Sequence, residues 1–539
     1  MTSLHTSAQC RELDRLMIEQ EGVAGFELMR RAGRAAFDEL LLRWPGIRSV
    51  SICCGKGNNA GDGYVIAGLA QEIGLKVQLL QVGDAAQLRG DAAQAKAWAE
   101  ARGVAPGQGD ASFTGEVILD ALLGTGLSGP LREPFKTAVE RINASGRPVL
   151  AVDVPSGVNA DNGAVANAAV RADLTVSFIG AKLGLHTGPG LAVRGALVQA
   201  GLGVPDRVLA QVPGCPWLRF DAAELPALAI DQHKHRMGHL VVAGGDAGMG
   251  GAPLMAAEAA LRTGTGLVSL LTRPEHQAAI LARRPELMAQ DASDAERAAA
   301  LLGRASAVVV GPGLGRTPWG ERLLRLALAA GQPTVIDADG LRWLAELELR
   351  PKGELIITPH PGEAAALLAA GAPDRGSRLS GESSFASGDP AGSAHRHVSA
   401  HGIEADRPAA ALALAREFDA VAVLKGPGTL CAADELLGLC AHGNPGMATA
   451  GMGDVLAGVI GGLLAQGLGP SRAATLGTCL HGWAGDRAAQ RRGQRGLIAT
   501  DLFAAIAEAV SQSDEAVSQG DEAVSQGDEA VSWGEGALP

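Results

Sequence analysis

Aromatic residues are scarce in this sequence of 539 residues, at 3% of the chain with a single tyrosine. Basic residues are also few: 46 lysines and arginines face 58 aspartates and glutamates, which gives a net charge of −12. No basic stripe with interleaved aromatics occurs, and this excludes an ordinary nucleic-acid-binding surface. Because bulky rings are rare, we expect a core built from Ala, Val and Leu and from close backbone approach.

Cysteine is sparse, and long apolar runs are missing. The seven cysteines include no CxxC pair, so we interpret them as free thiols of a cytoplasmic protein. The first twenty residues reach acidic side chains before any apolar stretch forms, which is not the pattern of a signal peptide. The most apolar run, residues 455–465, is too short to cross a bilayer, so we expect no membrane partner.

Glycine and small apolar residues are what the sequence has in abundance. Hydrophobic residues make up 47% of the chain and glycines number 74, and the length suits more than one domain. Strand-like runs ending in polar or glycine turns alternate with helical runs in both halves, which predicts an α/β fold with parallel, doubly wound sheets. Parallel α/β domains often assemble, so a homo-oligomer stays open, without a defined number of copies.

Changes in composition suggest where the domains end. We expect a first domain over residues 1–214, a Pro-punctuated linker over 215–230 and a second domain over 231–510. Residues 371–401 are rich in Gly, Ser and charge and are predicted to be a flexible insertion in the second domain. Residues 511–539 carry acidic heptapeptide repeats and are predicted to form a low-complexity tail.

The first domain has a glycine-rich turn, CGKGNNAGDG at residues 54–63, directly after an apolar run. Alone it is a weak signal, since an ordinary strand-to-helix connection can have the same composition. Two further strands end in acidic residues, Asp120 before GTGLSGP and Asp153 before PSG. The carboxyl ends of parallel strands meet at one edge of a sheet, so these residues are predicted to form a binding site with the glycine turn.

These motifs, CGKGNNAGDGYVIA, DALLGTGLSGP and DVPSGVNADNG, resemble the N-terminal epimerase domain of bifunctional NAD(P)H-hydrate repair enzymes, a Rossmann-like domain. The resemblance implies interconversion of the R and S hydrates of NADH and NADPH (NADHX and NADPHX) at carbon six of the nicotinamide ring. It implies catalysis by Asp153 and a potassium ion held by Asn59, Asp120 and Ser156. The residues implied to contact the hydrate are Asn58, Asn59, Ala60, Gly61, Asp62, Gly124, Thr125, Gly126, Leu127, Ser128, Gly129, Pro130 and Asp153. Ala60 stands where the family usually has glycine, and a positive φ there would crowd the turn.

Seven motifs follow one another in the second domain: HKHRMGH, GGDAGMGGAP, GPGLG, DADGL, TPHPGE, KGPGT and GMATAGMGD. A glycine loop before a helix can hold transferred phosphate, and a carboxylate at its end can take the proton of an acceptor hydroxyl. Asp454 is the candidate base. The plainer interpretation of Asp454 is a helix N-cap.

This ordered set resembles the ribokinase-like, ADP-dependent NAD(P)H-hydrate dehydratase of the same repair enzymes. The resemblance implies that phosphorylation of the ring hydroxyl and loss of phosphate convert the S hydrate to NAD(P)H, with ADP as donor, AMP and phosphate as products and magnesium as cofactor. Ala252, Gly313, His360 and Asp454 are implied to contact the hydrate. Those implied around the adenine nucleotide are Lys425, Gly426, Pro427, Gly428, Thr429 and Gly453.

Two other classes of function stay open from the residues themselves. One is a vitamin-type small-molecule kinase with a dinucleotide-binding regulatory domain, because the chemistry of Asp454 is shared by such kinases. The other is a dinucleotide sensor without catalysis. The motif TPHPGE and the motifs of the first domain argue against a kinase of this type. The acidic residues at both predicted sites argue against a sensor without catalysis.

Overall fold

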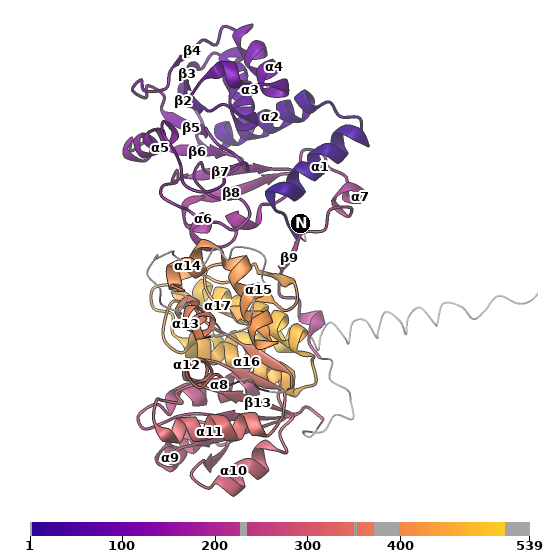
Figure 1. The fold of residues 1–539 in the computed structure, drawn as a ribbon, viewed down its shortest axis with the longest axis vertical. Coiled ribbons are helices and arrows are strands. Elements are labelled where there is room, and N and C mark those ends of the chain that lie inside the picture. Colours follow the sequence, from indigo (N-terminus) through magenta and orange to yellow (C-terminus); the bar gives the residue numbers. More distant parts are fainter. Residues whose placement is uncertain are drawn as a thin grey trace, which may run out of the picture. The chain divides into compact units, whose positions relative to one another are not determined.

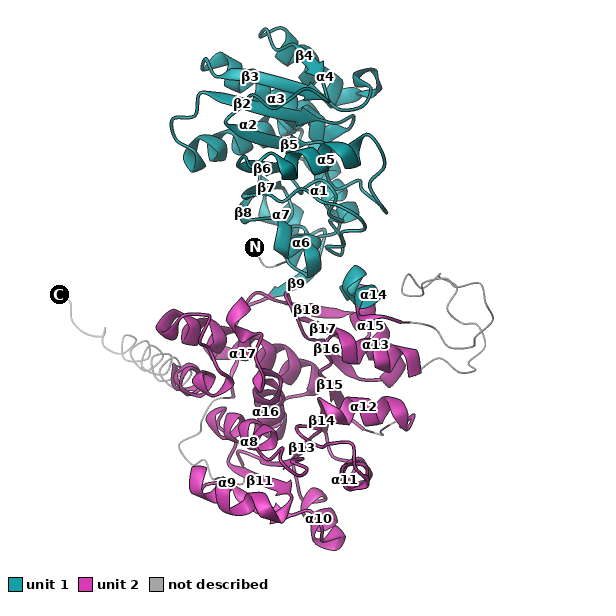
Figure 2. Ribbon diagram, turned by 90° about the vertical axis from the view of Figure 1, so that its left-hand side faces the viewer, with its two compact units in different colours: residues 1–217, 401–408 teal, residues 218–400, 409–539 magenta. Residues whose placement is uncertain are grey.

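The computed structural model describes residues 3–226, 234, 236–349, 351, 353–370 and 398–512 (Figure 1). The chain divides into two compact units. Unit 1 comprises Met1–Trp217 and His401–Pro408, and unit 2 comprises Leu218–Ala400 and Ala409–Pro539 (Figure 2).

Unit 1 is built on a parallel sheet with the strand order β4-β3-β2-β5-β6-β7-β8. Apolar side chains of helices α2, α3 and α4 cover one face, and those of α5 cover the other. The strands are β2 (Ser49–Cys54), β3 (Lys76–Gln81), β4 (Pro106–Gln108), β5 (Val117–Ala121), β6 (Val149–Val152), β7 (Leu174–Phe178) and β8 (Ala196–Ala200). The helices are α1 (Ser7–Glu19), α2 (Gly25–Arg43), α3 (Asn58–Glu72), α4 (Gly90–Glu100), α5 (Phe135–Ala144), α6 (Gly188–Val193) and α7 (Asp206–Leu209).

The expected linker over residues 215–230 begins with ordered structure. Its first residues form β9 (Cys215–Leu218), which pairs antiparallel with β1 (Ser3–Leu4). In unit 2, the backbone N–H of Phe220 donates to Nε2 of His442 at 3.0 Å. Residues 227–233 and 235 lie outside the described part of the chain. The exact domain boundaries stay a prediction.

Unit 2 contains a mixed sheet with the strand order β18-β17-β16-β15-β14-β13-β10-β11-β12. The pairs from β16 to β12 are parallel, and β17 and β18 add an antiparallel edge. The strands are β10 (His239–Ala243), β11 (Leu267–Thr272), β12 (Met288–Asp291), β13 (Ala307–Val310), β14 (Thr334–Ile336), β15 (Leu355–Ile357), β16 (Val421–Leu424), β17 (Leu430–Ala432) and β18 (Leu436–Cys440). The helices are α8 (Gly251–Arg262), α9 (Gln277–Arg283), α10 (Ala295–Leu302), α11 (Pro318–Ala329), α12 (Asp339–Glu346), α13 (Pro361–Ala370), α14 (Ala400–Ala405), α15 (Arg407–Phe418), α16 (Met452–Ala465) and α17 (Pro470–Arg492). Part of α14 and the first residues of α15 belong to unit 1.

Helix α16 packs against its neighbours through glycines. A Cβ atom on Gly458 would lie 2.0 Å from the backbone oxygen of Ala256 in α8, and one on Gly461 would lie 2.3 Å from Cγ2 of Val309 in β13. The missing side chains therefore allow α16 to lie in close contact with both the helix and the sheet.

The sheets confirm the predicted α/β class with parallel strands in both halves. Residues 371–397 of the expected insertion and residues 513–539 of the expected tail lie outside the described residues. All seven cysteines are free thiols, as predicted. Within the described ranges, no helix is both long and apolar enough to cross a membrane.

Candidate functional sites

A cavity of about 940 Å³ opens in unit 1 at the carboxyl ends of the parallel strands. Its lining includes many of the residues predicted to bind the hydrate, namely Asn58, Asn59, Asp62, residues 124–128, Pro130 and Asp153. Ala60, Gly61 and Gly129 do not line it. Segments distant in sequence therefore meet at one edge of the sheet, as the positions after the strands predicted.

The glycine-rich turn is shorter than its composition suggested. Helix α3 begins at Asn58 with Gly57 as its N-cap, so residues 58–62 lie in the helix and not in a loop. Ala60 is fully buried and has no positive φ. Its methyl group is therefore part of the helix packing, and the crowding considered for a loop does not arise.

Asp120 and Ser156 form a buried cluster beside this helix. Oγ of Ser156 donates to Oδ1 of Asp120 at 2.6 Å, and the backbone N–H of Ser156 donates to Oδ2 at 2.8 Å. Burial raises the pKa of Asp120 to about 6, against the opposing effect of these hydrogen bonds. Both side-chain polar atoms of Asn59 are buried without a hydrogen-bond partner, an arrangement that calls for a further ligand.

Asp153 directly follows β6 and has a φ of 67°, which is unusual for a residue with a side chain. Its Oδ1 lies 2.5 Å from Nζ of Lys182, whose side chain is 3% exposed. Burial opposes the charge on Lys182, but Asp153, Cys10 and Asp14 outweigh it and raise the pKa of the amine. Asp153 is thereby held next to a buried cation on the wall of the cavity.

In unit 2, the start of helix α16 brings Asp454 to a second charged cluster. The N-cap of α16 is Gly451, with φ of 87°, and Asp454 is the third residue of the helix, so the N-cap interpretation of Asp454 is wrong. Nζ of Lys425 lies 2.6 Å from Oδ1 of Asp337. A Cβ atom on Gly453 would lie 3.2 Å from Nζ of Lys425 and 3.3 Å from Oδ2 of Asp337, so only a very small residue fits there comfortably.

The charges of this cluster tune Asp454. Burial and the neighbouring Asp337 raise the pKa of Asp454 to about 7, while Lys425 acts in the opposite direction. Burial disfavours the charged form of Lys425, but Asp337, Glu363 and Asp454 raise its pKa overall. A carboxylate with a pKa near neutrality beside a permanent cation is suited to general-base catalysis.

His360 lies at the start of α13, with half of its side chain exposed. Its Nδ1 accepts from the backbone N–H of Gly362 at 3.0 Å, and its own backbone N–H donates to Oε2 of Glu363 at 2.8 Å. The same Glu363 oxygen is 3.8 Å from Nζ of Lys425, so His360 reaches the charged cluster through Glu363.

Residues 425–429 form the turn between the antiparallel strands β16 and β17. Gly426 and Gly428 have φ of 136° and 65°, and Oγ1 of Thr429 donates to the oxygen of Gly426 at 3.1 Å. This predicted nucleotide loop is therefore anchored at Lys425 by the ion pair with Asp337.

Ala252 and Gly313 are neighbours in space. A Cβ atom on Gly313, which has a positive φ of 57°, would lie 3.3 Å from Cβ of Ala252 and 2.7 Å from the oxygen of Met249. The oxygen of Gly313 accepts from the backbone N–H of Asp246 at 2.7 Å. Two of the predicted hydrate-binding positions, one at the start of helix α8 and one in the loop after β13, are thus brought together.

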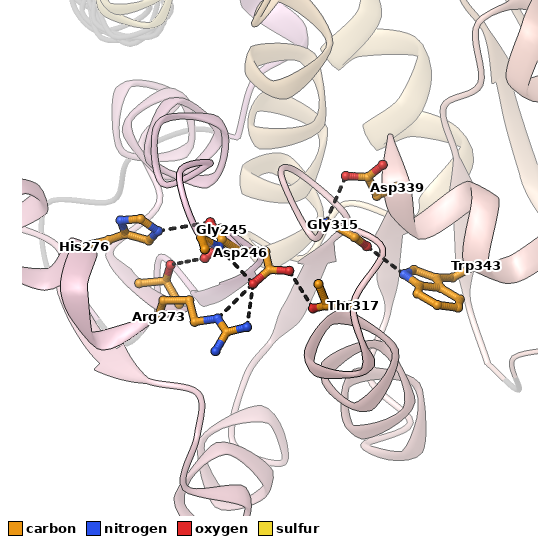
Figure 3. A network of polar contacts seen from close by, with 10 residues as sticks. Gly245, Asp246, Arg273, His276, Gly315, Thr317, Asp339 and Trp343 are labelled. Atoms are coloured by element: carbon orange, nitrogen blue, oxygen red, sulfur yellow. Dashed lines mark hydrogen bonds and ion pairs between the residues drawn. The ribbon is translucent and has the colours of Figure 1, made fainter.

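The side chain of Asp246 ties these loops to their surroundings (Figure 3). Its Oδ1 accepts from Nη2 of Arg273 at 2.6 Å, and its Oδ2 accepts from Oγ1 of Thr317 at 2.6 Å. Nearby, the N–H of Gly315 donates to Asp339 and its oxygen accepts from Trp343. The network connects the segments that follow β10, β11, β13 and β14 around Gly313.

Sequence reasoning did not identify Asp14, Lys182, Asp246 or Asp337 as site residues. Asp246 and Asp337 lie inside the motifs GGDAGMGGAP and DADGL, so a polar residue after a strand was a usable signal. Asp14 lies in helix α1, where no glycine motif marks it. Lys182 follows the glycine turn after β7, which sequence reasoning did not include in a site. The described residues contain no group of three or more His, Cys, Asp and Glu side chains suited to a metal ion.

Comparison with known proteins covers both units. Residues 240–508 match the family model described as NAD(P)H-hydrate dehydratase, and residues 25–184 match the one described as YjeF-related protein N-terminus. A bifunctional NAD(P)H-hydrate repair enzyme of Coxiella burnetii is 45% identical over 510 residues, which are 93% of this chain and 98% of the relative. The enzyme of that name from Escherichia coli is 40% identical over 91% of this chain and 90% of its own length. A solved ribokinase-like superfamily protein of Enterococcus faecalis has 24% identity and a TM-score of 0.47 over 55% of this chain and 95% of its own. This chain belongs to the family of bifunctional NAD(P)H-hydrate repair enzymes.

Proposed function

We propose that this protein repairs hydrated NADH and NADPH at two separate sites. Unit 1 interconverts the R and S hydrates at carbon six of the nicotinamide ring, and unit 2 converts the S hydrate to NAD(P)H at the expense of ADP. The observation that carries the proposal is the position of Asp454, at the start of α16 beside Lys425 and Asp337, in a chain that matches repair enzymes over almost its whole length.

In unit 2, Asp454 takes the proton of the ring hydroxyl. The hydroxyl oxygen then bonds to the β-phosphorus of ADP, the bond from that phosphorus to the bridging oxygen breaks, and AMP leaves. Phosphate is a better leaving group than hydroxide, so cleavage of the bond between carbon six and oxygen, with loss of a proton from carbon five, restores the reduced ring. The pKa of Asp454 near 7 supports this role, because the base is ionised in a useful fraction at neutral pH.

We propose that Lys425 to Thr429 and Gly453 hold the nucleotide, and that Ala252, Gly313, His360 and Asp454 hold the hydrate. Asp337 helps to raise the pKa of Lys425, and two glycines in its turn have a positive φ, a combination of cation and turn that suits a phosphate. Magnesium would neutralise charge on the transferred phosphate, held mainly by the nucleotide itself, because Mg²⁺ retains waters and uses few side chains.

In unit 1, we propose that the cavity binds the hydrate through residues 58–62, 124–130 and Asp153. A potassium ion would be held by Asn59, Asp120 and Ser156, with oxygen ligands that suit a hard cation. The unpartnered buried amide of Asn59 fits this assignment. The ion would supply fixed positive charge beside the substrate phosphates.

The test is to incubate the full chain with NADH hydrate and ADP and to follow the return of the absorbance of reduced nicotinamide. We expect return with ADP and none without nucleotide, and parallel reactions with ATP establish the preferred donor. A kinase for another substrate or a sensor gives no return. Starting from pure R hydrate without ADP, chromatography should detect the S form if unit 1 is an epimerase.

A further inference from the structure

Asp14 is a carboxylate on the wall of the unit 1 cavity that none of the family motifs includes. It lies in the middle of helix α1, before the segment 25–184 that the family model matches. Asp14 lines the cavity together with Asp62, Asp153 and Lys182. Three carboxylates and one ammonium from four different segments therefore face the same space.

The surroundings of these carboxylates differ, and they shift the pKa values of Asp14 and Asp62. Asp153 is paired with Lys182 at 2.5 Å. Burial raises the pKa of Asp14 to about 6, with Lys182 lowering it and Asp153 raising it. Burial, together with Asp153 and Asp14, raises the pKa of Asp62 well above its ordinary value. With a pKa of about 6, Asp14 can act as a base at neutral pH, and the raised pKa of Asp62 favours a proton on that carboxyl, so these two side chains of one cavity wall can serve as base and acid.

Inversion at carbon six needs both kinds of group. This carbon carries the hydroxyl and is bonded to the ring nitrogen, so it opens when the hydroxyl loses its proton and the carbon–nitrogen bond breaks with its electron pair going to nitrogen. The nitrogen takes a proton, and an aldehyde results. After rotation, the nitrogen attacks the other face of the aldehyde, loses its proton and leaves a hydroxyl of opposite configuration. No oxidant or reductant is consumed.

We propose that Asp14 is a catalytic residue of the first site, which takes the hydroxyl proton on ring opening and returns it on closure, while Asp62 exchanges the proton of the ring nitrogen. The proposal rests on the epimerase function proposed for unit 1. It extends the site to helix α1 and gives Lys182 a positioning role, because Lys182 holds Asp153 in an ion pair and lowers the pKa of Asp14.

The proposal makes the pH dependence of epimerisation specific. A base must be ionised, so kcat/KM should fall as pH drops through about 6. Asp14 shares the cavity wall with Lys182, Asp153 and Asp62. The other charged side chains that line the cavity are Arg11, Lys56, Asp91, Arg132 and Glu133. Asp120, buried next to Ser156, has a pKa near the same value, so an Asp14 variant is needed to assign the limb.

The experiment uses the full chain without ADP, pure R hydrate and chromatographic detection of the S form, after subtraction of the uncatalysed rate. Asp14→Asn should lower kcat by about two to four orders of magnitude, with KM nearly unchanged and the acidic limb gone. Asp14→Glu, which keeps a carboxylate, should recover part of the rate and the limb. Glu19→Gln, an exposed change on the same helix, serves as the matched control and should behave like the wild type.

Each outcome decides the matter. Wild-type protein that does not interconvert the hydrates refutes the epimerase function itself. Active wild type whose Asp14→Asn variant keeps its rate or its acidic limb overturns only the role of Asp14. A variant that loses binding, with no recovery in Asp14→Glu, makes Asp14 a positioning residue and also overturns the proposal. If Asp14→Asn fails to fold, the wild-type protein provides the test: a kcat/KM for epimerisation that is constant between pH 5 and about 8 overturns the proposal.

Discussion

Lys425 and Asp337 form an ion pair with 2.6 Å between Nζ and Oδ1, and the Asp337 side chain is 1% exposed. The second oxygen of Asp337 has no hydrogen-bond partner and lies toward Gly453, next to Asp454. The pair thus fixes a cation and a carboxylate near the proposed base, and they move its pKa in opposite directions.

Replacing Asp454 should separate the two activities. Asp454→Asn preserves the size of the side chain but removes the base, so we expect ADP-dependent dehydration of the S hydrate to fall by about two to four orders of magnitude. Epimerisation should be unchanged, because Asp454 lies in unit 2. Chromatography of both hydrates measures both rates, and intact dehydration would refute the base assignment.

Asp153→Asn should have the converse effect. It removes the counter-charge of the buried Lys182 on the cavity wall, so epimerisation should fall and the R hydrate should accumulate while the S hydrate is repaired normally. The exposed Asp206→Asn in the same unit is the control. Equal disappearance of R and S in Asp153→Asn would count against a role for Asp153.

The pH profile of dehydration should respond to Asp337. Because Asp454 acts in its ionised form, activity is present above its pKa and is lost as pH falls through about 7. Asp337 raises that pKa, so Asp337→Asn should move the acidic limb to lower pH. Profiles of kcat/KM for the S hydrate measure the shift, and Asp434→Asn, exposed in the β17–β18 turn, should cause none. A limb moved to higher pH would contradict the described charge arrangement.

Asp246 should matter for stability. Burial acts against its charge, but hydrogen bonds from Thr317, Ala247 and Arg273 lower the pKa of this carboxyl. The ionised Asp246 therefore stabilises the folded protein above the unfolded-state pKa of about 4, and this stabilisation is lost as pH falls through the lower folded-state pKa. Asp246→Asn should lower the free energy of unfolding by about 1–3 kcal/mol at neutral pH, measured by urea denaturation.

The matched control for this stability change is Glu321→Gln, which removes a surface pair with Arg325 one helical turn away. Such a pair is worth about 0.3–0.5 kcal/mol. Equal losses in the two variants would show that the Asp246 network contributes no more than a surface contact.

The strands and their order along the chain could be predicted because each is a short apolar run ended by a polar or glycine turn. The apolar run SVSICC forms β2, and the run HLVVAGG contains β10, which ends before the two glycines. The rule that ligands bind at the carboxyl ends of parallel strands also predicted that Asp153 and the glycine-rich turn would meet, and both line the cavity. The membership in the repair-enzyme family, expected from the motifs, is confirmed.

The helix starts were harder to predict. Asn58 and Asp454 lie in first helical turns, because the glycines before them act as N-caps and the helix begins inside the motif. Lys182 and Asp14 were missed because their proposed roles depend on which charges the fold brings near them, and the residues adjacent to them in the sequence do not indicate these contacts. The implied roles of individual residues stay predictions.

The close contact of α16 with α8 and β13 has a consequence for mutational scanning and for comparison of family members. Gly458 and Gly461 are not among the residues proposed to bind a ligand, yet a methyl group at either would collide with backbone or a buried side chain and displace the helix that carries Asp454. In a saturation library selected for repair activity, substitutions at these two glycines should therefore be depleted as strongly as substitutions in the charged cluster. Intolerance to substitution along α16 would then reflect the close packing of this helix against α8 and β13. Catalytic positions would have to be recognised by the loss of turnover in variants that remain folded.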